Sequence, residues 1–210
     1  MKRLLTTGLL ATTLLGAALP ASAGLLVNVY KNAGTSGIGG VIDAMKTKKA
    51  DYSTVAQVIN FSDDGNAGNY SGDAAFPGDV QDWFGLSATG WIDIATAGIY
   101  DFRSFADDGV QLKIGNTLMF SDSGYHAVEY RTGSTYLAAG RHAIEFLYFE
   151  GSVYGNVELE ARAIGGTWKL LGAEGGIQTA DSAGNLPEPG SVALLGLAAA
   201  GLGFARRRKQ

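Results

Sequence analysis

The sequence contains no cysteine and only two histidines. The absence of cysteine excludes disulfides, thiol catalysis and thiolate metal sites, even if the protein reaches an oxidising compartment. His126 and His142 are too few for a histidine-rich transition-metal site. Order must therefore come from core packing, helped by an oxygen-ligated ion such as Ca²⁺ if one is bound.

Basic residues are scarce away from the two ends of the chain. Residues 24–185 hold 10 lysines and arginines against 19 aspartates and glutamates, a net charge of −9. This balance argues against nucleic acid and anionic lipid surfaces as partners. It suits cation binding or plain solubility, and 162 residues are enough for one domain with a substantial core.

The first 23 residues have the pattern of a secretory signal peptide. A basic start is followed by an apolar stretch from Leu4 to Leu19, and Ala21-Ser22-Ala23 has the small-x-small form of a signal-peptidase site. A transmembrane helix is the alternative, but the cleavage motif favours an exported protein whose mature chain begins at Gly24.

The C-terminal residues 186–210 form a second sorting pattern. Pro187-Glu188-Pro189 precedes an uncharged run at 192–205. A basic cluster follows, which begins with Arg206, Arg207 and Arg208. The prolines favour an extended, protease-accessible segment, and the basic cluster favours the cytoplasmic side of a membrane. This order resembles the PEP-CTERM sorting signal of exopolysaccharide-producing bacteria. The resemblance implies recognition and removal by exosortase, a membrane protease.

A permanent membrane anchor is the alternative for this C-terminal run. Its fourteen residues would reach only about 21 Å as a helix, against roughly 30 Å of hydrocarbon. We therefore expect transient membrane insertion before processing. The expected destination is the cell surface or the extracellular matrix.

Short β-rich runs separated by turn residues fill the remaining chain and predict an all-β, antiparallel sandwich or barrel. Gly115-Asn116 predicts a two-residue hairpin turn. We expect one domain over residues 24–171 and a linker over 172–185, with a glycine-rich loop at 32–40, a turn of helix at 44–49 and a polar loop at 63–78. The predicted strands are Leu25–Tyr30, Val55–Phe61, Trp91–Ile94, Ile99–Phe105, Val110–Ile114, Thr117–Phe120, Tyr125–Tyr130, Ser134–Leu137, Arg141–Phe149 and Asn156–Ala163, with an edge strand at Trp168–Leu171.

Four motifs in residues 83–163 carry a second resemblance: Gly98–Phe102, Asp107–Gly109, Tyr136–Glu145 and Tyr148–Gly151. Together they are similar to the centre of a protective-antigen (PA) domain. Such modules occur in anthrax protective antigen, some glycosidases and yeast flocculin adhesins. The resemblance implies a lectin-like β-sandwich.

Asp107-Asp108-Gly109 is the strongest candidate for site chemistry. Two adjacent carboxylates repel each other unless a cation lies between them, and hard oxygen ligands suit Ca²⁺. The alternative is an ordinary turn, because aspartate can cap its own backbone and glycine accepts a positive φ. The residues alone leave both interpretations open.

The resemblance to flocculin adhesins adds specific expectations about this loop. It implies a cis peptide between Asp107 and Asp108, and calcium ligands from the loop after Tyr148. Carried onto this chain, Glu150 would supply a third carboxylate, and Ser152 and Tyr154 would supply backbone carbonyls. The adhesins have asparagine at the position of Glu150. The resemblance therefore supports calcium binding by this chain more strongly than it supports sugar binding.

Other side chains are weaker candidates. Trp83, Trp91, Tyr125, Tyr130 and Tyr154 could stack on sugar rings, although aromatic residues in strands more often pack in cores. Tyr154 is the exception because it falls in a glycine-flanked loop. His126, beside Tyr125, is better explained by a surface hydrogen bond than by catalysis. The sequence has no Gly-x-Ser-x-Gly motif, and no enzyme activity is expected.

Two functions remain at this level. The first is an exported binding protein that recognises carbohydrate or exopolysaccharide through Asp107, Asp108 and Tyr154, with calcium as a candidate cofactor. The second is a structural matrix protein without a specific ligand site. In either case the partners during export would be signal peptidase, exosortase and, transiently, the membrane.

Overall fold

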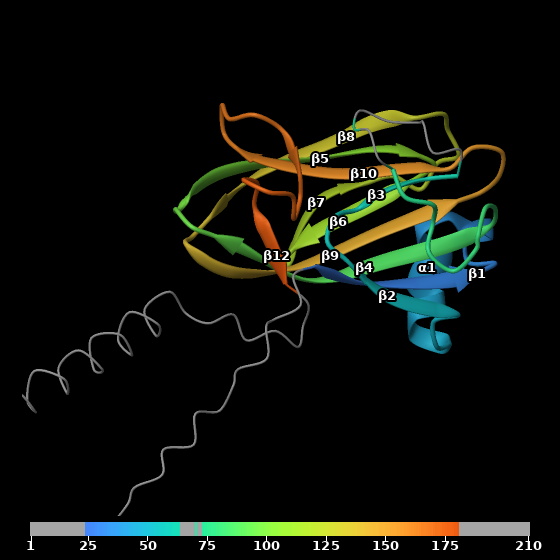
Figure 1. The fold of residues 1–210 in the computed structure, drawn as a ribbon. Coiled ribbons are helices and arrows are strands. Elements are labelled where there is room, and N and C mark those ends of the chain that lie inside the picture. Colours follow the sequence, from blue (N-terminus) through green and yellow to red (C-terminus); the bar gives the residue numbers. More distant parts are fainter. Residues whose placement is uncertain (1–23, 64–69, 71–72, 181–210) are drawn as a thin grey trace, which may run out of the picture.

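Two antiparallel β-sheets stack face to face in a computed structural model that describes residues 24–63, 70 and 73–180 (Figure 1). The elements are β1 Leu25–Lys31, the 3₁₀ turn η1 Gly34–Ser36, α1 Gly37–Thr47, β2 Tyr52–Ala56, β3 Asn60–Ser62, β4 Phe84–Ile94, β5 Gly98–Asp107, β6 Val110–Ile114, β7 Thr117–Ser121, β8 Glu129–Leu137, β9 Gly140–Glu150, β10 Asn156–Ala163, β11 Lys169–Leu170 and β12 Gln178–Ala180.

The seven-stranded sheet has the order β2-β1-β4-β9-β6-β7, with β12 paired to β4. The five-stranded sheet has the order β11-β10-β5-β8, with β3 paired to β10. Short, alternating strands joined by tight turns bury one face of each sheet against the other. The predicted antiparallel sandwich is therefore confirmed, and the sheets do not close into a barrel.

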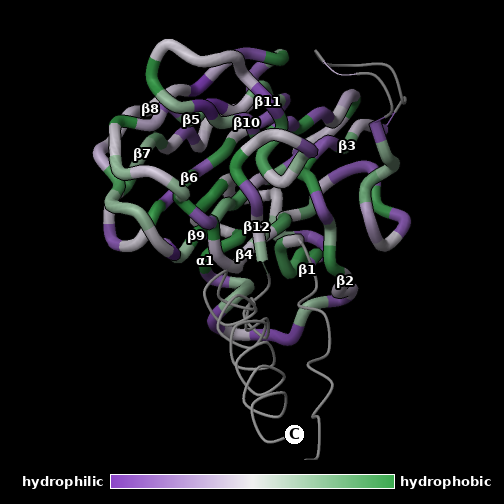
Figure 2. Tube along the Cα trace, turned by 60° about the vertical axis from the view of Figure 1, so that its left-hand side comes forward, coloured by the Kyte–Doolittle hydropathy of each residue, from purple (hydrophilic) through white to green (hydrophobic). Residues whose placement is uncertain are grey.

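Large apolar side chains fill the space between the layers. Hydrophobic residues, green in Figure 2, are numerous along the central strands. The C-terminal half of β9 is buried on both faces. Phe146 and Tyr148 point into the sandwich core, while Leu147 and Phe149 pack against Ile38 and Val41 of α1. Because α1 covers the outer face of the seven-stranded sheet, the C-terminal end of β9 is enclosed from both sides.

The outer face of the five-stranded sheet carries a different kind of packing. Arg103 on β5 makes a bidentate ion pair with the fully buried Glu160 on β10, at 2.7 and 2.8 Å. The Tyr70 hydroxyl donates to the same carboxylate, and the Arg103 guanidinium lies 4.3 Å from the centroid of the Trp168 ring. The buried Glu160 carboxylate is therefore paired with a cation that the fold itself supplies.

Several predicted boundaries are wrong. The run 55–61 is not one strand, because β2 ends at Ala56 and β3 begins at Asn60. The helix begins at Gly37, inside the expected loop. The predicted strand at 125–130 is loop up to Val128, and 129–137 forms a single strand. Strand pairing also continues past residue 171, since β12 lies within the segment expected to be a linker.

The loop at 63–78, predicted from its polar residues, also contributes to the core. Phe76 is buried, and its ring stacks on Tyr148 with centroids 5.4 Å apart. The hairpin at Gly115 is confirmed, with the glycine at φ 57°. No helix in the described ranges is long and apolar enough to cross a membrane. The signal segment 1–23 and the apolar run 192–205 lie outside the described residues.

Candidate functional site

The Asp107-Asp108-Gly109 turn lies where β5 ends and β6 begins. Its Asp107–Asp108 peptide bond is cis, as the family resemblance implies. Gly109 is required by close packing, because a Cβ at this position would lie 2.4 Å from the Phe149 ring and 2.5 Å from the Asp122 carbonyl oxygen. The turn is therefore held firmly against the end of β9.

Sheet register brings Glu150 to the same place. β9 pairs with β6, with Tyr148 opposite Val110, so the last residue of β9 lies beside the turn that precedes β6. Carboxylate oxygens of Asp107, Asp108 and Glu150 all lie within 4.8 Å of one another. We refer to these three residues as the carboxylate triad.

Neighbouring backbone and hydroxyl groups fix the orientation of the triad. Asp108 accepts hydrogen bonds from the backbone N–H groups of Gly151 and His126, both at 2.8 Å. The Tyr148 hydroxyl lies 2.7 Å from Glu150 Oε2 and 2.7 Å from the Asp107 carbonyl oxygen. Since a hydroxyl carries one hydrogen, both contacts are satisfied when protonated Glu150 donates to Tyr148 and Tyr148 donates to Asp107.

Burial dominates the electrostatics of the triad. Burial raises the pKa of Glu150 to about 9. The hydrogen bond from Tyr148 lowers this pKa, whereas the charges of Asp108, Asp107 and Asp63 raise it further. Burial, followed by the charge of Asp108, likewise raises the pKa of Asp107 to about 6. Three ionised carboxylates are therefore unfavourable here without a cation.

The donor set fits a hard cation such as Ca²⁺. Glu150 is 0% exposed, and its Oε1 atom has no hydrogen-bond partner among the described residues. A buried carboxylate oxygen without a partner is costly, and carboxylate oxygens are the ligands that calcium prefers. Ser152 and Tyr154 are exposed in the loop after Glu150, and their roles as carbonyl ligands remain predictions.

A small pocket opens beside the triad. It has a volume of about 230 Å³ and is lined by Asp63, Gln81, Asp82, Val153 and Tyr154. Gly155 separates it from the triad: its N–H donates to Asp63 Oδ2 at 2.8 Å, and a Cβ on it would lie 3.1 Å from Glu150 Oε2. Tyr154 is 62% exposed, so its ring is available to a ligand.

Asp63 and Asp82 were not among the candidates predicted from the sequence, and core packing was the favoured interpretation for Trp83 and Tyr125. Trp83 and Tyr125 are both exposed, with ring centroids 6.4 Å apart. A Cβ on Gly151 would lie 2.6 Å from the Tyr125 ring and 3.0 Å from Asp108 Oδ2, so Tyr125 borders the triad. The positive φ of Trp83, 55°, reflects a loop conformation that periodicity does not reveal.

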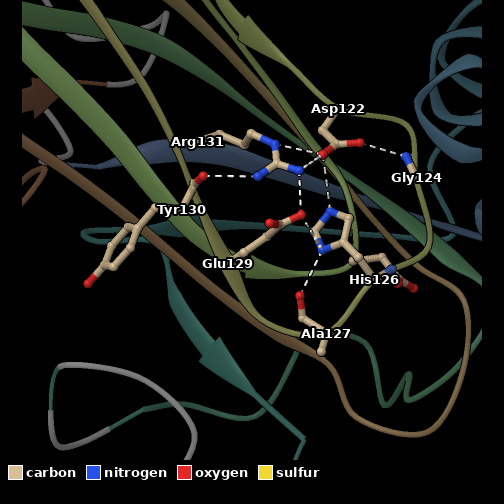
Figure 3. A network of polar contacts seen from close by, with 8 residues as sticks. Asp122, Gly124, His126, Ala127, Glu129, Tyr130 and Arg131 are labelled. Carbon is tan, nitrogen blue, oxygen red and sulfur yellow. Dashed lines mark hydrogen bonds and ion pairs between the residues drawn. The ribbon is translucent and has the colours of Figure 1, made fainter.

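The loop before β8 holds a second cluster, formed by Asp122, His126 and Glu129 (Figure 3). Here Arg131 lies between the two carboxylates and makes an ion pair with each. The His126 ring lies 3.3 Å from Asp122 and 3.5 Å from Glu129, and its Nδ1 lies 2.8 Å from the Ala127 carbonyl oxygen. This cluster contains its own cation and orders the loop that donates to Asp108.

The domain matches a known family. A model of the PA14 domain matches residues 36–174, which is most of the chain. The chain belongs to the PA14 domain family. This family is the one that the resemblance to protective antigen indicates under a different name, so that recognition is confirmed at the level of the domain. No curated protein matches the chain by sequence.

Solved PA14 domains share the fold. The "PA14 sugar-binding domain from RTX adhesin" is 23% identical over 71% of this chain and 95% of its own, with a TM-score of 0.58. The PA14 domain of the MpAFP antifreeze protein is 22% identical over 74% and 91%, with a TM-score of 0.56. The epithelial adhesin 9 A domain from Candida glabrata, in complex with Galβ1-3GlcNAc, is 12% identical over 79% and 93%, with a TM-score of 0.56.

The C-terminal end also matches a known pattern, the PEP-CTERM protein-sorting motif, over residues 185–209. The resemblance of this end is thereby confirmed, and the motif implies export to the cell surface or beyond. Its residues, including Pro187, Glu188, Pro189 and the three arginines 206–208, lie outside the described part of the chain, as do Ala21 and Ala23 of the expected signal-peptidase site.

Proposed function

We propose that this PA14 domain is an exported, calcium-dependent carbohydrate-binding protein of the cell surface or extracellular matrix. Asp107, Asp108 and Glu150 hold the ion, and the carbonyls of Ser152 and Tyr154 complete its shell. Exopolysaccharide is the proposed ligand. The protein binds and does not catalyse.

The observation that carries this proposal is the unpaired oxygen of Glu150. Within the described residues, no lysine or arginine forms an ion pair with any member of the carboxylate triad. Burying a carboxylate beside two others without a cation is unfavourable by several kcal/mol. A divalent ion removes that cost, because it supplies opposite charge and accepts the free oxygen as a ligand.

The surroundings of the triad support a sugar as the second partner. An ion held at the edge of the sandwich can accept vicinal hydroxyl oxygens as further ligands. Tyr154, Trp83 and Tyr125 are exposed around it and offer ring faces for C–H groups of a pyranose. Two of the structural neighbours are described as sugar-binding or as a complex with a disaccharide, which agrees with this proposal.

The destination follows from the sorting motif. Signal peptidase would cleave after Ala23, and exosortase would process the chain at the PEP-CTERM motif after transient membrane insertion. The domain would then work among the polysaccharides that surround the cell.

Replacing Glu150 with glutamine tests the ion site, because glutamine has the shape of the protonated glutamate and keeps a donor for Tyr148. We expect calcium at about 100 times its Kd to raise the unfolding free energy of the wild type by about 2.7 kcal/mol. The Glu150→Gln variant should fold but lose most of this increase. Thermal unfolding with calcium or with a chelator measures both.

Asp43→Asn is the matched control, since it removes an exposed carboxylate on α1. It should retain the full calcium response. A wild-type melting temperature that is the same in calcium and in chelator would refute the ion site. Binding to a panel of glycans should be lost in chelator, whereas no binding in either condition would favour a structural matrix protein.

A further inference from the structure

The described lining of the pocket beside the carboxylate triad is acidic. Asp63 and Asp82 line it, together with Gln81, Val153 and Tyr154. None of these five described lining residues is a lysine or an arginine. A ligand in this pocket therefore meets carboxylates, an amide and a phenol, but no basic side chain among the described lining residues.

The charge of the region exceeds what one divalent cation can balance. Three triad carboxylates around such an ion leave one negative charge, and Asp63 and Asp82 add two more. Asp63 acts electrostatically on the triad, since its charge contributes to the raised pKa values of both Asp107 and Glu150. The pocket and the ion site therefore form one electrostatic unit that remains negative after the ion binds.

Each pocket carboxylate accepts one hydrogen bond from a backbone N–H and keeps capacity to accept others. One oxygen of Asp63 accepts from the Gly155 N–H, while the other, Oδ1, is buried without a partner among the described residues. Asp82 uses Oδ1 for the Val153 N–H at 3.1 Å, and its side chain is otherwise exposed at the pocket rim. The volume of about 230 Å³ is below the roughly 300–1,000 Å³ of drug-sized clefts, so it suits a single sugar ring.

We propose that this pocket selects a hexosamine residue whose amino group is free and protonated, as in a partly N-deacetylated polysaccharide, over neutral and uronic acid residues. This proposal rests on the proposed function, because it assigns the substrate class of the same site. The ammonium group binds between Asp63 and Asp82 through charge-assisted hydrogen bonds, and the ring hydroxyls face the ion. A uronate is rejected because its carboxylate would lie among uncompensated carboxylates.

The test measures binding of the full chain, in calcium, to three oligomers of equal length: β1-4-linked glucosamine, β1-4-linked N-acetylglucosamine and glucuronic acid. We expect the glucosamine oligomer to bind about tenfold more tightly than its acetylated counterpart, the size expected of one charge-assisted hydrogen bond at a partly exposed site. The glucuronic acid oligomer should bind most weakly. The preference should shrink as salt increases, because the attraction is partly screened.

Asp82→Asn separates local recognition from the overall negative charge of the protein. Asparagine retains the acceptor for Val153, and we expect this variant to bind both glucosamine and acetylated oligomers with similar affinity. Glu174→Gln removes the same charge in the turn between β11 and β12, and should keep the tenfold preference. Equal losses in both variants would attribute the preference to net charge and overturn the inference.

The remaining outcomes distinguish this inference from the proposed function. Calcium-dependent binding that favours the acetylated or uronic acid oligomer overturns the amino-sugar preference and leaves the proposed function standing. Absence of binding to all three oligomers, in calcium and in chelator, overturns both.

Discussion

Glu150 and Glu160 are two fully buried glutamates with opposite surroundings. Glu160, on the outer face of the five-stranded sheet, is paired with Arg103 and receives the Tyr70 hydroxyl. Glu150, at the end of β9, contacts Tyr148 through one oxygen, faces Asp107 and Asp108, and has no partner for the other oxygen in the described structure. The first is neutralised by the fold itself, and the second is suited to an ion from outside.

The comparison shows that burial alone does not determine the role of a carboxylate. A buried carboxylate that has a fixed cation contributes a specific contact between strands, whereas one without a cation titrates or binds metal. The cluster of Asp122, His126 and Glu129 belongs with Glu160, because Arg131 compensates it. Among the described clusters that could hold an ion, only the carboxylate triad has no such arginine.

Removing Arg103 should have the largest effect on stability. Glu160 would then be buried without a cation, as Glu150 is, but with no ion site beside it. We expect Arg103→Met to lower the unfolding free energy by about 3–5 kcal/mol, the cost of leaving a buried charge unpaired. Urea unfolding at neutral pH measures the loss. Adding Glu160→Gln to this variant should restore part of the stability, and a double variant no more stable than the single one would contradict the explanation.

The pH dependence of stability in chelator should give the next largest effect. On folding, the pKa of Glu150 rises from 4.5 to about 9 and that of Asp107 from 3.8 to about 6. The folded chain therefore binds more protons than the unfolded chain over this range, and its unfolding free energy falls as pH rises. Between pH 5 and pH 8.5 we expect a loss of at least about 1.4 kcal/mol, equivalent to one pKa unit.

Urea unfolding across this pH range, with chelator present, tests the prediction. Glu150→Gln should flatten most of the decline, because glutamine does not titrate. In calcium the trend should weaken or reverse, since ligand deprotonation favours ion binding at higher pH. A wild-type curve in chelator that rises with pH would show that Glu150 is compensated like Glu160.

The smallest expected effect is that of Tyr148→Phe. The change keeps the ring that stacks on Phe76 but removes the hydroxyl between Glu150 and the Asp107 carbonyl. We expect a loss of about 1 kcal/mol in unfolding free energy, the net value of a typical hydrogen bond. Calcium binding should also weaken, because the Tyr148 hydroxyl helps to hold Glu150. Titration calorimetry with calcium checks this, and an unchanged affinity would contradict it.

Sequence alone predicts much of the fold because the strands are short, alternate in polarity and end at recognisable turns. It predicts the meeting of Asp107 and Asp108 with Glu150 only through family resemblance, since these positions lie more than forty residues apart and are joined by sheet register. Phe76 and Asp63 were missed because a polar, glycine-rich loop carries no periodic signal. The start of α1 was misplaced because glycine disfavours helix in isolation, whereas here close packing requires it.

Gly34 illustrates this tertiary requirement. A Cβ at Gly34 would lie 2.2 Å from the Glu150 carbonyl oxygen, so only glycine permits the turn before α1 to approach the end of β9. Propensity is a weak guide where such an approach determines the residue. The exposure of Trp83 and Tyr125 likewise depends on how the loops around Gly151 pack, which the sequence does not show.

The position of Gly90 has a mechanical consequence. A Cβ there would lie 2.4 Å from the Ala180 carbonyl oxygen and 3.0 Å from Leu25, so β1 and β12 meet end to end along the same edge of β4. A pulling force applied between Leu25 and Ala180 would act across this short junction and not along the sandwich. The carboxylate triad, beside the opposite end of β4 and about 20 Å away, would lie outside the line of that force.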